Sequence, residues 1–341
     1  MSGRTVNGTT AAIAWTEEEI SALSSKVAAL KASMATVIIG QENVIDSLII
    51  CLLAGGHALV EGVPGLGKTL LVKSLSQATH MDFHRVQFTP DLMPSDIVGT
   101  EILEEDHATG KRVFRFQQGP VFTQVLLADE INRAPPKTQS ALLEAMQERS
   151  VTFAGQTHAL PKPFFVLATQ NPIEQAGTYP LPEAQLDRFL LRIDVAYPTE
   201  EEEIRMVAAT TNAGLRDAEA VMDVATLLRL QHLVRDIDIG EHLLAYATRL
   251  VRATRPALST VPAVKQHVGW GAGPRAGQAL VLASKARALM QGRLAVTRDD
   301  IAAMLLPVLA HRVLRNFEAE ADGVAIADIL LALREHIRPE Q

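Results

Sequence analysis

The sequence is poor in cysteine, with only Cys51 among 341 residues. A single thiol cannot form an intrachain disulfide or a thiolate metal cluster, and this usage is typical of a protein in a reducing compartment. We therefore expect Cys51 to be a small buried residue of the core. The ten histidines show no HExxH motif and no other metal-ligand spacing, so the sequence offers no histidine-based metal site either.

A surplus of positive charge is also lacking. Lys and Arg number 32 against 39 Asp and Glu, which gives a formal net charge of -7. A chain with this balance has no global basic field to hold a nucleic-acid backbone, although a local patch would escape this count. We therefore expect no nucleic-acid partner.

Long hydrophobic runs are absent as well. The longest, Leu48 to Val60, is broken by Gly55, Gly56 and His57 and falls short of the roughly 20 residues that a membrane helix needs. The first ten residues, MSGRTVNGTT, lack a charged start followed by an apolar stretch and a cleavage site. We therefore expect the run 48–60 to be a core segment and not to insert into a membrane. We also expect no secretion signal and a cytoplasmic location.

The composition that is present is that of a globular protein, with 48% hydrophobic and 21% charged residues. The length favours about two domains, and we expect three regions, at residues 1–35, 36–197 and 198–341. The first holds a polar tail and an amphipathic helix that docks on the protein's own core. The pair Thr16 and Glu19 forms a capping box ahead of its apolar face, which consists of Ile20, Leu23, Val27, Leu30 and Met34.

The second region alternates short apolar strand patterns with helical segments, which is typical of a mostly parallel sheet covered on both faces. Two further segments, 100–117 with a turn near Gly110 and 149–160 with a turn near Gly155, read as inserted β-hairpins. The five predicted strands are at 58–62, 83–88, 125–129, 164–169 and 189–194.

Strand patterns end near Pro198, where we expect the domain boundary. Two more capping-box pairs, Thr199 with Glu202 and Thr297 with Asp300, begin helices beyond it. The third region should therefore be all helical. Its stretch 257–273, rich in Pro and Gly, is expected to be a loop.

A phosphate-binding loop is the strongest functional signal. The segment GVPGLGKT follows a predicted strand and precedes a predicted helix, which is the context that this motif requires. Its glycines let backbone N–H groups surround a phosphate, Lys68 reaches the β- and γ-phosphates, and Thr69 can bind Mg²⁺. The predicted nucleotide-binding residues are Gly62, Val63, Pro64, Gly65, Leu66, Gly67, Lys68, Thr69 and Leu70.

Two carboxylates follow the apolar strand VLLA. Asp129 and Glu130 emerge at its carboxyl end, where ligands collect in open α/β sheets. Asp129 would hold Mg²⁺ and Glu130 would deprotonate the attacking water. The simpler alternative is that the pair caps the next helix.

Asn171 ends the strand FFVLAT and is a candidate sensor that bonds the attacking water and the γ-phosphate. Taken alone, an Asn before a Pro more often forms a turn. The sensor interpretation therefore depends on the two motifs already described.

With these motifs in order, the chain resembles the MoxR family of AAA+ ATPases over roughly residues 36–335. The resemblance is carried by VLLADEINRAPPKTQSALLEAMQE and by ATQNPIEQAGTYPLPEAQLDRF. It implies an α/β AAA+ P-loop domain, with a five-stranded parallel sheet, helices on both faces and β-hairpin insertions, followed by an all-α lid. It also implies a cytoplasmic homo-oligomeric ring, often a hexamer, that assists maturation of client proteins, frequently with von Willebrand A-domain partners.

The same resemblance implies roles for two arginines. Arg188, in LDRF, takes the arginine-finger position and would reach the nucleotide of a neighbouring subunit. Its alternative is a surface ion pair. Arg275, in WGAGPRAG, matches the second sensor, an arginine that contacts the γ-phosphate from the helical domain and would couple nucleotide state to lid angle. Trp270 and Gly273 stand where the family commonly has Tyr and Ser.

Weaker candidates lie elsewhere. Arg133 and Tyr179 could contribute to a subunit interface, but a helix-surface role and an ordinary turn explain them equally well. Phe114 and Phe116 on the first predicted hairpin could touch a client in a pore. Packing of that hairpin against the sheet is the favoured alternative for both.

We therefore expect a Mg²⁺-dependent ATP hydrolase that remodels, matures or activates a protein client. A nucleotide-gated assembly platform with slow turnover would carry the same motifs. A nucleic-acid motor is disfavoured by the acidic balance. A magnesium-chelatase-like protein is disfavoured only through the closer resemblance to MoxR.

Overall fold

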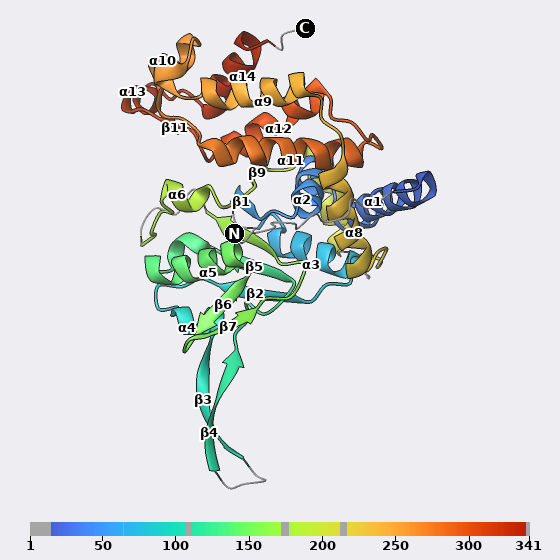
Figure 1. Cartoon of the computed structure of the whole chain (residues 1–341), viewed down its shortest axis with the longest axis vertical. Coiled ribbons are helices and arrows are strands. Elements are labelled where there is room, and N and C mark those ends of the chain that lie inside the picture. The colour runs from blue at the N-terminus through green and yellow to red at the C-terminus, as the bar shows by residue number, and fades with distance from the viewer. Residues whose placement is uncertain (1–14, 64, 107–110, 172–176, 212–216, 339–341) are drawn as a thin grey trace, which may run out of the picture.

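The computed structural model describes residues 15–63, 65–106, 111–171, 177–211 and 217–338 (Figure 1). Pro64 of the predicted phosphate loop and the predicted turn at Gly110 lie outside these ranges. Among the described helices, none is long and apolar enough to cross a membrane.

A five-stranded parallel sheet organises the chain. Its order is β2-β5-β8-β1-β9, and its strands are β1 (Ala58–Gly62), β2 (Phe83–Gln87), β5 (Val125–Asp129), β8 (Phe165–Gln170) and β9 (Leu191–Val195). All five predicted strands are confirmed, with ends shifted by at most two residues. Alternate residues enter different cores: Leu59 packs on one face of the sheet, whereas Ala58 and Val60 pack on the other.

Different helices cover the two faces. The smaller core lies between the sheet and α4 (Pro94–Val98) and α5 (Pro136–Glu148). The larger core lies under α1 (Glu17–Val37), α2 (Glu42–Leu53) and α3 (Lys68–Ala78). Cys51 and most of the run 48–60 are buried in this larger core, as predicted. Helix α1 begins with the Thr16–Glu19 capping box and buries its predicted apolar face, so it docks on the protein itself.

Both predicted hairpins are present. β3 (Gly99–Asp106) pairs with β4 (Lys111–Gln118) and extends away from the body of the molecule (Figure 1). β6 (Ser150–Phe153) pairs with β7 (Gln156–Ala159). Phe116 stacks on Phe153 and His158, which joins the two hairpins, whereas Phe114 is 72% exposed. Phe116 therefore packs within the fold, but on the second hairpin rather than on the sheet as predicted, and the packing alternative is wrong for Phe114.

The carboxyl-terminal part is helical, as predicted. After the short helices η1 (Ile131–Arg133) and α6 (Glu183–Leu186), the chain forms α7 through α14. These are α7 (Glu200–Thr211), α8 (Val224–Asp236), α9 (Glu241–Ala253), α10 (Pro262–His267), α11 (Pro274–Met290), α12 (Arg298–Leu309), α13 (Phe317–Ala321) and α14 (Ile326–His336).

The predicted loop at 257–273 is wrong in its first part. η2 (Pro256–Leu258), α10 and β10 (Val268–Trp270) occupy most of it, and β10 pairs with β11 (Leu314–Arg315). Pro256 and Pro262 each stand in the first turn of a helix. Proline is favoured there because its missing N–H would be unpaired in any case and its φ is already helical.

The lid helices continue the larger core of the sheet. α11 packs against α2 as well as against α8, α9 and α12. Buried side chains from these helices and from β1 belong to one cluster. A domain boundary near Pro198 remains a prediction, because no break in the core marks it.

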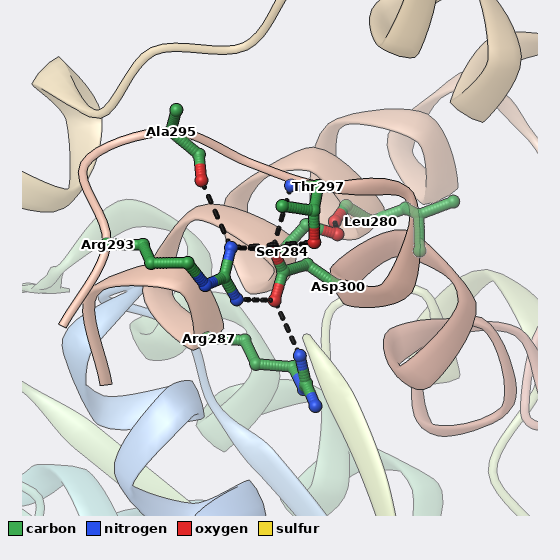
Figure 2. Close-up of polar contacts among 7 residues, drawn as sticks. All are labelled: Leu280, Ser284, Arg287, Arg293, Ala295, Thr297 and Asp300. Atoms are coloured by element: carbon green, nitrogen blue, oxygen red, sulfur yellow. Dashed lines mark hydrogen bonds and ion pairs between the residues drawn. The ribbon is translucent and has the colours of Figure 1, made fainter. Parts of the chain in front are cut away.

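A buried carboxylate ties α11 to α12. Asp300 is fully buried and accepts hydrogen bonds from Arg293, Arg287 and Thr297, as Figure 2 shows. Burial alone would raise the pKa of Asp300. The bonds from the two arginines and Thr297 outweigh burial and lower the pKa to about 2.

We expect Asp300→Asn to lower the free energy of unfolding by about 3 kcal/mol, since two arginines then lose their buried partner. Because the pKa is depressed in the folded state, the contribution of Asp300 is full above its unfolded pKa of 3.8 and is lost as the pH falls toward 2. Urea unfolding followed by circular dichroism at several pH values tests both points. Asp299→Asn, at the exposed neighbouring position, is the matched control and should change little.

Candidate functional site

The predicted phosphate loop joins β1 to α3 through glycines of two kinds. Gly65 and Gly67 have φ values of +88° and +76°, which L-residues with side chains rarely adopt, and open space surrounds both. Gly62 is different, because a Cβ there would lie 2.9 Å from the carbonyl oxygen of Val195 on β9. The loop can therefore turn tightly around a ligand while β1 and β9 stay closely paired.

Lys68 is the first residue of α3 and lies beside the carboxylates that follow β5. Its Nζ donates a hydrogen bond to the carbonyl oxygen of Gly62, at 2.6 Å. Burial lowers the pKa of Lys68, and the charges of Asp129 and Glu130 oppose this shift. The sequence motifs from two distant segments thus meet at one edge of the sheet. Thr69 and Leu70 follow in the first turn of α3.

Thr169 of β8 bridges the Asp129 carboxylate and the Glu130 backbone. Its hydroxyl donates to Oδ1 of Asp129 at 2.7 Å and accepts from the backbone N–H of Glu130 at 2.8 Å. Glu130 has a φ of +57°, a strained conformation for a residue with a side chain and one that clusters at functional sites. The backbone therefore turns away from the strand immediately after Asp129.

Strand β2 supplies partners that the sequence did not indicate. Arg85 donates two hydrogen bonds to Oδ2 of Asp129, at 2.7 and 3.1 Å. Gln87 and Arg133 donate to Oε2 of Glu130, at 2.7 and 3.0 Å. Arg133 and Glu130 are three residues apart and form a local ion pair, which agrees with the helix-surface role considered for Arg133. The capping role proposed as an alternative for the carboxylates is not found, since Glu130 makes no side-chain cap bond.

Asn171 lies just after β8, in a position that is only 5% exposed. Because β8 is between β5 and β1 in the sheet, this residue emerges at the same edge as the phosphate loop and the carboxylates. Tyr179 donates its backbone N–H to the carbonyl of Asn132, at 2.6 Å, which ties the following turn to the same region.

A mostly apolar cavity of about 470 Å³ adjoins the phosphate loop. A site of this size and character suits a nucleobase. Its walls come from the end of α1, from the phosphate loop and from α7, and they include Val37, Ile38, Ile39, Leu66, Leu70, Met206 and Thr210. Of the residues that line this cavity, Gly65, Leu66, Gly67 and Leu70 were predicted to bind the nucleotide.

Arg188 and Arg275 lie together, but at the opposite edge of the sheet. Both line a cleft of about 280 Å³ that also borders Gly55, Gly56 and His57, just before β1 begins. The phosphate loop leaves the other end of that strand. Among the described residues, neither arginine forms an ion pair, so the surface-pair alternative for Arg188 finds no support in this structure.

The cleft gathers three more arginines, none of them a sequence candidate. Arg149 and Arg235 line it with Arg312. The pKa of Arg149 is lowered by burial and then by the charge of Arg235. Such a concentration of positive charge attracts an anion.

Arg312 is a structural member of this group. It is 8% exposed, and its Nε donates to Asp187 at 2.7 Å. Further bonds reach the carbonyl oxygens of Leu190 and Asp187. The lid thus holds the loop that carries Arg188.

The described residues include no group of three His, Cys, Asp or Glu that could hold a metal ion. The available donors are the Thr69 hydroxyl and the Asp129 carboxylate. Hard oxygen donors of this kind, few in number, fit Mg²⁺ that is shared with substrate phosphates.

Comparisons with known proteins agree with this geometry. Residues 57–191 match the model of the ATPase family associated with various cellular activities (AAA), and residues 262–332 match the AAA lid domain. The chain is 44% identical to Chaperone MoxR1 of Mycobacterium tuberculosis, over 85% of this chain and 76% of that protein. It is 32% identical to Protein MoxR of Paracoccus denitrificans, over 88% and 92% of the two chains.

A solved structure from Cytophaga hutchinsonii, provisionally described as an ATPase, is also similar. It superposes with a TM-score of 0.88 at 40% identity, covering 95% of this chain and 98% of that one. Motifs, fold and relatives therefore agree, and the chain belongs to the MoxR family of AAA+ ATPases.

Proposed function

We propose that the protein hydrolyses ATP in a ring in which each active site is shared by two copies of the chain. One observation carries this proposal: the phosphate loop and the Arg188–Arg275 cleft lie at opposite ends of β1. A five-residue strand spans about 17 Å. Neither arginine can reach a nucleotide held by its own chain, but both can reach one held by a neighbour that packs against the cleft.

Within one chain, the phosphate loop binds the triphosphate. Backbone N–H groups of the loop and the start of α3 face the phosphates, and Lys68 leaves the Gly62 carbonyl to contact the β- and γ-phosphates. The base enters the apolar cavity between α1 and α7. Gln41, whose Nε2 donates to Leu66 at 3.3 Å, holds the loop against that cavity.

Glu130 accepts the proton of the attacking water. Its left-handed backbone conformation and the hydrogen bond from its N–H to the Thr169 hydroxyl fix the point from which the side chain leaves the backbone. A hydrogen bond from Gln87 restrains its carboxylate. Asn171 orients the water from the neighbouring strand. The neighbour's Arg188 and Arg275 stabilise the negative charge that develops on the γ-phosphate.

Mg²⁺ would be held by Thr69 and Asp129, and when bound it neutralises phosphate charge. The Arg85 guanidinium now occupies one oxygen of Asp129, and the other accepts from Thr169. Arg85 is half exposed, so it can release that oxygen at little cost.

We further propose that hydrolysis drives remodelling of a protein client in the cytoplasm. Support comes from the relative named as a chaperone, MoxR1, and from the hairpin β3–β4, which presents the exposed Phe114 beside the exposed Leu103. A hexameric ring and a von Willebrand A-domain partner complete the proposal.

Replacing Glu130 by Gln should leave ATP binding intact and slow steady-state hydrolysis by about 10²- to 10⁴-fold, because the amide cannot take the proton of the water. Phosphate release and binding of a fluorescent ATP analogue measure the two quantities. Glu148→Gln, at an exposed position of α5, is the control. Intact hydrolysis in Glu130→Gln would show that the base lies elsewhere. Full biological rescue by a slow Glu130→Gln protein would favour the nucleotide-gated platform instead.

Sharing of the site can be tested by mixing two inactive proteins. Arg188→Ala keeps its phosphate loop, and Lys68→Ala keeps its arginine cleft. In randomly mixed rings about one quarter of the sites combine the intact halves, so activity should return to about one quarter of the wild-type value. Arg275→Ala mixed with Lys68→Ala should behave alike.

Each variant alone, at the same total concentration, is the control for the mixing experiment. Wild-type turnover per chain should also rise with protein concentration as rings assemble. If mixing restores nothing while rings still form, the arginines serve their own chain or no chain, and the shared site is wrong.

A further inference from the structure

Helix α7 is exposed on nearly every side. None of its twelve residues is buried, and Ile204 and Val207 are 61% and 55% exposed. An isolated helix of this length is marginal in water, because helices in proteins are stabilised mainly by packing of an apolar face. Within the part of the chain that the structure describes, this helix therefore lacks a packing partner for its apolar residues.

The exposed face of α7 is apolar and acidic. Met206 and Thr210 line the base cavity. Glu200, Ile204 and Val207 are spaced as one helical face, and none of these three lines that cavity. Over its length α7 carries four Glu and one Arg, which gives a net charge of -3. Within the described ranges, Glu200, Glu201 and Glu203 form no ion pairs.

A complementary groove lies between α9 and α11. It encloses about 700 Å³, and its apolar walls include Leu244, Val251, Val281 and Leu282. Leu244 is 46% exposed although it lines this groove.

The rim of this groove is basic. Arg235, Arg252 and Arg255 lie along it. Arg235 and Arg252 form no ion pair with any described residue, and Arg255 donates to the Ala272 carbonyl. A groove with an apolar floor and cationic rim suits a helix with an apolar, acidic face.

The two surfaces also border the two halves of the proposed shared site. α7 forms a wall of the base cavity. The groove is continuous with the arginine cleft, since Arg235, Gln278 and Leu282 line both. When the cleft of one copy covers the phosphate loop of the next, the groove therefore comes toward α7.

We propose that α7 of one copy docks in the α9–α11 groove of the neighbouring copy. Ile204 and Val207 pack on Leu244, and Glu200 and Glu203 pair with Arg235 and Arg252. This docking rests on the proposed ring, and it adds a contact between copies that lies outside the proposed active site. Because the same helix lines the base cavity, nucleotide binding and this contact stabilise one another.

Cysteine crosslinking tests the contact directly. Cys51 is fully buried, and burial raises the pKa of its thiol, so it does not compete with introduced cysteines. Val207→Cys and Leu244→Cys chains are mixed with ATP and Mg²⁺ and treated with a short bismaleimide. We expect a covalent dimer of the two chains.

The matched control pairs Val207→Cys with Leu331→Cys, which puts a thiol at an exposed position of α14 (44%). Light scattering on the same samples reports assembly. If rings form but Val207→Cys reacts no better with Leu244→Cys than with Leu331→Cys, the docking is wrong and the ring stands. If no assembly forms at any concentration, the ring itself is wrong, and this docking falls with it.

Charge exchange supplies an independent measurement. Glu203→Arg should raise the protein concentration needed for assembly severalfold, and adding Arg252→Glu in the same chain should restore it, because the pair is then reversed. Glu335→Arg, an exposed change on α14, should have no such effect. Failure of Arg252→Glu to rescue Glu203→Arg would overturn the proposed pairing.

Discussion

Burial of the parallel sheet on both faces is the constraint on which the rest of the structure depends. The strands contribute apolar side chains alternately to two cores, so neither face has room for polar chemistry. Polar groups are confined to the two ends of the strands. The groups predicted to bind phosphate gather at the carboxyl ends, and five arginines gather near the amino ends. In the shared site proposed above, the separation between those ends is the reason that two chains are needed to complete one site.

The fold was largely predictable from local patterns. Runs such as VLLA and FVLA are short, apolar and bounded by polar residues, and a strand is the element that fits them. The phosphate loop was predictable because its glycines serve a backbone conformation, which Gly65 and Gly67 show in their positive φ values. The loop predicted at 257–273 was wrong because proline was taken only as a helix breaker, although Pro262 begins α10.

The features that could not be predicted from the sequence depend on contacts between distant segments. Nothing near Thr169 indicates that its hydroxyl bridges Asp129 and Glu130, since β5 and β8 become neighbours only in the sheet. Arg149, Arg235 and Arg312 are scattered over more than 160 positions, and only packing of the lid brings them beside Arg188. The exposure of α7 is a further case, because only the fold shows that no other described segment buries it.

The buried guanidinium of Arg312 has a mechanical consequence. It clamps the lid, at the turn after α12, to the segment that carries Arg188, while the lid helices share a core with β1 and α2. A chain built in this way resists bending near Pro198, where the sequence predicts a domain boundary. In the ring proposed above, the lid and the Arg188 segment then move as a single rigid body, so that changes of ring shape occur at the contacts between chains rather than within them.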